Sequence, residues 1–258
     1  MLLALIVGAQ LAYLFAAHGQ WRRGRHWSLW RLAAFLGGAG LVAAALSPPV
    51  VFHGHVDLRW HMAQHLLLGM FAPLLLVLAA PGTLLLRSVP RWVTRGLSRL
   101  LRHGLVRGLS HPLTALLLNV GGMYLLYLTP LYAASLVSPR LHVLIHLHFL
   151  LAGCLFTWAI LAGPDPAPHA PGPRTRLGVL FCSMAAHATL GKLMYGFGWP
   201  RDTHHGPEEI QAAAQLMYYG GDLAELLLLV ALFIRWPQPF GLASGKRHWP
   251  LRVSSRGR

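Results

Sequence analysis

Long apolar runs separated by short polar loops constrain this chain more than any other feature of its sequence. Of its 258 residues 55% are apolar and 11% are charged, and the mean hydropathy is +0.50. Helical spans of a bilayer need roughly 18 to 20 apolar residues, and several runs approach or exceed that length. We therefore expect an all-α polytopic membrane protein with seven transmembrane helices. The expected spans are residues 1–17, 30–46, 58–80, 111–132, 140–162, 177–198 and 210–234.

Basic residues supply the orientation of these spans, because cytoplasmic loops of membrane proteins are enriched in Lys and Arg. With the N-terminus outside and the C-terminus in the cytoplasm, all but four of the 22 basic residues fall on the cytoplasmic side. The four exceptions are Arg59, Arg140, Arg201 and Lys192. The formal net charge of +15 therefore follows membrane topology, and we expect no nucleic-acid partner. Residues 1–235 form the predicted transmembrane domain, and residues 236–258 form a basic cytoplasmic tail.

One arginine-rich loop has the pattern of a helix that lies on the cytoplasmic membrane surface. Its basic and apolar residues fall on opposite faces, which is typical of contact with anionic lipid. The basic face holds Arg91, Arg95, Arg99 and Arg102, and the apolar face holds Val93, Leu97, Leu100 and Leu101. Membrane lipid is thus an expected partner of this segment.

Prolines mark the ends of several predicted elements. Pro48-Pro49 is expected to end the second span and to open an outer loop that runs to Asp57. Pro73 is expected to kink the third span. Ser138-Pro139 has the order of an N-cap and a first helical residue for the fifth span.

Two pairs of histidines at helical spacing are the strongest chemical signal. His61 and His65 share one face of the third span, and His142 and His146 share one face of the fifth. An i, i+4 imidazole pair lets one helix offer two ligands to a metal ion. The predicted topology puts both pairs at the same depth, one to two turns below the outer surface.

A fifth imidazole completes the predicted pocket. His187 lies near the middle of the sixth span, about one helix radius lower than the pairs. Isolated membrane histidines usually pack or form hydrogen bonds, whereas a metal ion would satisfy several of them at once. We expect these five histidines to converge as a metal site and His148 to point away from it. His53, His55, His204 and His205 in outer loops are either solvated or a loading station for an incoming ion.

Copper is the favoured metal, although imidazole alone suits zinc, copper, iron and nickel about equally. Thioether ligands favour Cu(I), and Met184 lies three residues before His187 on the same face. Asp222 is expected to point inward, either as an acceptor for an imidazole N–H or as an ion-pair partner of Lys192. The two cysteines, Cys154 and Cys182, form no CxxC pair and are expected to be packing residues.

Taken together, the motifs resemble those of the seven-span CtaG-type cytochrome c oxidase assembly proteins over roughly residues 5–235. The matching segments are His61-Met62-Ala63-Gln64-His65 with Ala72-Pro73-Leu74-Leu75, Tyr127-Leu128-Thr129-Pro130-Leu131-Tyr132, His142 and His146 leading to Gly153 and Phe156, and His187 followed by Gly191. The resemblance implies a non-enzymatic factor in the bacterial inner membrane that matures a haem–copper oxidase by handling labile copper. It implies an oxidase subunit as the partner; self-association stays open.

Other function classes remain as alternatives. Histidines on facing helices are also the axial ligands of haem b in membrane redox proteins. A di-iron hydroxylase is disfavoured because the chain has no HxxHH box, and no broken-helix repeat supports a transporter.

Overall fold

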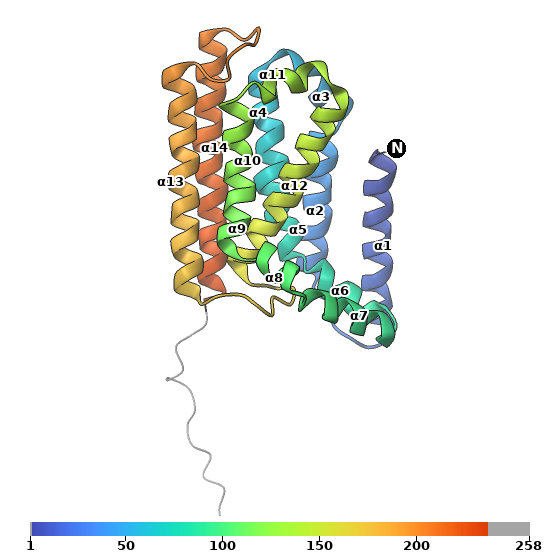
Figure 1. Cartoon of the computed structure of the whole chain (residues 1–258). Coiled ribbons are helices and arrows are strands. Elements are labelled where there is room, and N and C mark those ends of the chain that lie inside the picture. The colour runs from blue at the N-terminus through green and yellow to red at the C-terminus, as the bar shows by residue number, and fades with distance from the viewer. Residues whose placement is uncertain (1, 237–258) are drawn as a thin grey trace, which may run out of the picture.

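The computed structural model describes residues 2–236, and within that range the chain is helical with no β-strand. The all-α prediction is confirmed. The predicted tail lies, apart from Trp236, outside the described residues. Figure 1 shows a bundle of upright helices, with α1 standing apart from the rest at one side.

The helices follow one another with short connections. In chain order they are α1 (Leu2–Arg22), α2 (Leu29–Ala45), α3 (Pro48–Val56), α4 (Leu58–Leu66), η1 (Leu67–Phe71), α5 (Ala72–Leu78), α6 (Pro81–Ser88), α7 (Arg91–Leu101), α8 (Gly104–Leu109), α9 (Pro112–Leu116), η2 (Leu117–Gly121), α10 (Gly122–Tyr127), α11 (Leu131–Val137), α12 (Pro139–Leu161), α13 (Pro173–Phe197) and α14 (Pro207–Ile234). The segments η1 and η2 are π-helical.

Length and apolarity qualify four stretches of the described chain as candidate spans: Leu58–Leu78, Pro139–Leu161, Pro173–Phe197 and Pro207–Ile234. Two bent pairs, α2 with α3 at 50° and α9–α10 with α11 at 75°, raise the number to six if each pair is one span. The 21-residue α1 lies beside them. A multi-pass membrane architecture is supported, while the count of seven and the orientation stay predictions.

Two connections differ from the sequence prediction. Residues before Asp57 form the helix α3 instead of a loop, because Pro48 and Pro49 occupy the first turn, where a missing N–H costs nothing. The fourth span was expected to reach Tyr132, but its helix ends at Tyr127. Pro130 explains this break, since proline removes a helical donor and clashes with the preceding turn.

The kink predicted at Pro73 takes the form of the π-helical segment η1 just before the proline, and Leu58–Leu78 continues as one helical stretch. Pro73 has no N–H to donate to the carbonyl of Gly69, four residues earlier. That carbonyl lies against α12 at Gly153, where a Cβ atom would overlap the Gly69 oxygen. Only glycine lets the two backbones approach this closely, so Gly153 sets how α12 crosses η1.

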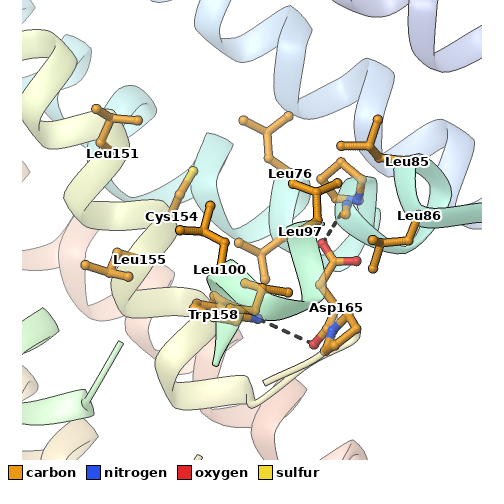
Figure 2. A pocket seen from close by; sticks show the side chains of 15 residues that line it. Leu76, Leu85, Leu86, Leu97, Leu100, Leu151, Cys154, Leu155, Trp158 and Asp165 are labelled. Atoms are coloured by element: carbon orange, nitrogen blue, oxygen red, sulfur yellow. Dashed lines mark hydrogen bonds between the residues drawn. The ribbon is translucent and has the colours of Figure 1, made fainter. Parts of the chain in front are cut away.

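We call the end of the bundle with α3 and α11 the histidine end and the end with α6 and α7 the arginine end (Figure 1). At the arginine end an apolar pocket of about 460 Å³ lies between α7 and the bundle. Leu97 and Leu100 of α7 and Trp158 of α12 line it (Figure 2). The arginine face of α7 is the opposite one, so the predicted amphipathic helix is confirmed, and its contact with lipid stays a prediction.

Asp165 fixes the start of α6 at this end. Its carboxylate accepts the backbone N–H groups of Gly82 (2.9 Å) and Thr83, two of the donors that a helix N-terminus leaves unpaired. Asp165→Ala is expected to weaken α6 by about 1–2 kcal/mol, as the loss of a cap does. Faster hydrogen–deuterium exchange at Gly82 and Thr83 is the readout. Asp165→Asn keeps one acceptor oxygen, so Gly82 and Thr83 should exchange more slowly in it than in Asp165→Ala. Equal exchange rates in wild type and both variants would contradict the capping role.

Candidate metal centre

His61 and His65 enter the core at the start of α4. The Asp57 side chain caps this helix by accepting the Arg59 N–H at 2.8 Å, and its pKa is lowered mainly by the hydrogen bond from the Arg59 guanidinium. The cap fixes the first turn, and both imidazoles then lie on the inner face. His61 is 1% exposed and His65 is 2% exposed.

His142 and His146 face the same space from α12. Ser138 caps this helix, as expected, by accepting the N–H of Leu141, and Pro139 occupies its first turn. His146 Nδ1 lies 2.8 Å from the carbonyl oxygen of His142, which can only accept. His146 therefore carries its proton on Nδ1 and offers the Nε2 lone pair to a ligand.

The imidazoles of α4 and α12 form a compact group. Ring centres are 5.5 Å apart for His61 and His146, 6.1 Å for His61 and His142, and 4.2 Å for His142 and His146. Two imidazoles on one tetrahedral metal have ring centres about 5 Å apart at ordinary bond lengths. The spacing thus matches shared coordination of one ion.

His187 from α13 lies lower in the bundle, with 0% exposure. Its ring rests against α14 at Gly221, where a Cβ atom would overlap the imidazole. It is close enough to His65 for the two rings to repel each other if both were charged. His65 also contacts Phe149 edge to face at 4.7 Å between ring centres. The five predicted histidines therefore converge from three helices.

Unsatisfied ring nitrogens set this cluster apart from ordinary core histidines. Neither nitrogen of His61, His65, His142 or His187 has a hydrogen-bond partner, although all are buried. Each such polar group costs about 1–3 kcal/mol. Within residues 2–236, however, no three His, Cys, Asp or Glu side chains are oriented to hold a metal ion. The imidazole rings are spaced to share one metal ion, but they would have to rotate to point their nitrogens at it.

Aromatic side chains enclose the histidines. The Tyr127 hydroxyl donates to the Met62 sulfur at 3.9 Å, and the Tyr132 ring lies 4.8 Å from that of His61. Both tyrosines and Met62 are fully buried. These three side chains therefore cover His61 with apolar surface apart from the tyrosine hydroxyls.

Two loop or helix-end histidines join the group, which the sequence left open. His55 of α3 stacks on His142 with ring centres 4.3 Å apart. His205 lies 3.1 Å from the Tyr132 hydroxyl and 2.7 Å from Glu209. Burial lowers the pKa of His205, against the Glu209 carboxylate, which raises it. The partners that tie them to the group, His142 and Tyr132, are distant from them in sequence, so no local pattern could have singled them out.

Met184 and Asp222 occupy other surroundings than expected. Met184 is half-buried and packs against the apolar core toward the arginine end of the bundle. Asp222 is half-buried, and the ion pairs within the described residues, Arg59–Asp57 and His205–Glu209, do not include it. Within the described residues the buried carboxylate is instead that of Glu225, which is 2% exposed.

Comparison with known proteins agrees with the motifs. Three mycobacterial proteins described as uncharacterized, Mb0105 of Mycobacterium bovis, MT0111 of Mycobacterium tuberculosis and ML1998 of Mycobacterium leprae, are each 38% identical over 177 residues. The match covers 66% of this chain and 27% of each relative, so the chain spans about a quarter of their length. No solved structure matches. Residues 11–238 match the family described as cytochrome c oxidase caa3 assembly factor (Caa3_CtaG), and the chain belongs to that family.

Proposed function

We propose that this protein assists the assembly of a haem–copper oxidase by holding copper as cargo among its five clustered histidines. The observation that carries the proposal is the set of buried ring nitrogens without partners on α4, α12 and α13. A bound ion is one of the explanations for such costly groups in a native structure. Family membership supports the oxidase as the recipient. The role is non-catalytic, and the predicted orientation puts the cluster near the outer surface.

Imidazole ligation suits a cargo that must be released. Neither cysteine belongs to the histidine cluster. Cys154 lines the apolar pocket at the arginine end, and Cys182 is exposed on α13. Without thiolates, the ion is held by neutral nitrogens alone and can exchange onto another protein's ligands. Ligation by the histidine cluster thus favours transfer of the ion over its permanent storage.

A groove beside the cluster supports lateral transfer to a membrane partner. It has a volume of about 420 Å³, and His142 and His146 of α12 line it together with Leu5 and Ile6 of α1. Its remaining lining is largely apolar. Cargo leaving through this side would reach a partner within the membrane, as delivery to an oxidase subunit requires.

Copper binding by the detergent-purified protein tests the proposal. Titration of Cu(I) against a competing chelator should show about one copper per chain. The double variant His61→Ala/His65→Ala should bind more than about 100-fold more weakly, because it loses ligands and not merely their supports. The matched control is His148→Gln on α12, whose wild-type ring bonds the Leu118 carbonyl at 3.0 Å outside the cluster.

Two outcomes would overturn the proposal. Equal copper affinity of wild type and the double variant would remove the cluster as the site. A stoichiometric haem Soret band in the purified protein would instead support the axial-ligand role for these histidines.

A further inference from the structure

A buried acidic layer lies one helical turn below the imidazoles. Ser183 of α13 donates to Glu225 Oε1 of α14 at 3.0 Å, and both side chains are almost fully buried. Glu225 Oε2 has no partner. His187 lies four residues after Ser183 on α13, and it contacts Gly221, which lies four residues before Glu225 on α14. Because four residues rise about 6 Å, the carboxyl lies directly beneath the lowest imidazole.

Glu225 borders a small cavity that also has two polar side chains of other elements in its lining. The cavity has a volume of about 20 Å³, enough for one water molecule, and Glu225, Asn119 and Thr157 line it. These residues come from α14, η2 and α12, so three elements each contribute a polar residue to the lining. Such an arrangement inside an otherwise apolar bundle is typical of a functional ionisable group.

No cation neutralises Glu225 within the described residues. Both ion pairs of that part of the chain lie elsewhere, at Arg59–Asp57 and His205–Glu209. Besides Ser183, the polar side chains around Glu225 are Thr157 on α12 and Asn119 on η2, which line the same cavity, Asp222 three residues earlier on α14, and His187 one turn higher on α13. An ionised Glu225 would therefore be an uncompensated charge within the membrane. A metal cation held only by neutral imidazoles would be uncompensated in the same way.

We propose that Glu225 is the counter-charge of the histidine site and exchanges one proton for one monovalent copper ion. The inference rests on the proposed function. Without copper the carboxyl group keeps its proton and is neutral. When Cu⁺ binds the imidazoles, the Glu225 O–H bond breaks, the proton leaves to water, and the carboxylate remains. One positive charge enters and one departs, no electron moves, and Ser183 stabilises the carboxylate through its hydrogen bond.

Proton release measured during Cu(I) titration in weak buffer tests the exchange. Wild type should release about one proton per copper bound. Glu225→Gln should release none, bind copper about 10- to 100-fold more weakly, and lose the pH dependence of affinity. Glu208→Gln, at the exposed first turn of the same helix, should behave as wild type.

An infrared difference spectrum of the wild type keeps the test independent of how well the variant folds. Copper addition should remove a protonated-carboxyl C=O band, and that band should be missing from Glu225→Gln. If wild type binds copper without losing the band, or if Glu225→Gln releases the same proton, the counter-charge is refuted and the histidine site stands. If wild type binds no copper, both proposals fail.

Discussion

Gly153→Ala is expected to be among the most damaging single-methyl additions to this bundle. The new Cβ would overlap the backbone oxygen of Gly69, which no side-chain rotation can relieve. Overpacking costs up to about 3 kcal/mol, and removing a glycine from a helix returns about 1 kcal/mol. The free energy of unfolding should therefore fall by about 2 kcal/mol, seen as a lower thermal midpoint in detergent.

Gly40→Ala on α2 is the matched control. A Cβ there meets no atom within 4 Å, so the helix should keep its stability or gain slightly. The same loss in both variants would mean that glycine content, and not the crossing of α12 over η1, decides stability.

Gly221→Ala is expected to have the largest effect on the site without removing any ligand. The added Cβ would occupy the position of the His187 ring and force the imidazole to move. Copper affinity should fall about 10- to 100-fold, as it does when the support of a ligand is lost. The measurement is the same chelator competition used for the histidine variants.

A double-mutant cycle separates this effect from general damage. In a His187→Ala background, Gly221→Ala should have no further effect on affinity, because no ring remains to be displaced. Gly196→Ala on α13, where a Cβ meets open space, should leave affinity unchanged in either background. Additive losses in the cycle would show that Gly221 acts through something other than His187.

The sequence predicted the helices and the histidine pairs because both depend on local periodicity. Apolar runs located the helices that become α4–α5, α12, α13 and α14, and i, i+4 spacing placed His61 with His65 and His142 with His146. Matched depth then followed from the positions of the pairs within their runs. These inferences need no knowledge of tertiary contacts.

Features that depend on distant backbone were not predictable in the same way. On α14, Asp222 was expected to point inward, but it is only half-buried, and Gln211 and Gln215 earlier on the helix are exposed. The buried face instead follows Met217, Gly221 and residues four and seven further on, which brings Glu225 inside. The small residues before Glu225, including Gly221, were the available signal for this buried face, since close packing of helices in membranes uses such residues.

The two π-helical turns, η1 and η2, have a consequence for comparing relatives of this chain. Each holds one residue more than an ordinary α-turn, and one residue amounts to about 100° of rotation. The half of α4–α5 that carries the imidazoles is thus out of phase with the half that follows η1. A one-residue gap at residues 67–71 in a relative would rotate His61 and His65 by about 100° relative to α5 while leaving both histidines in the aligned sequence, so the length of this stretch should be compared together with the HxxxH motif.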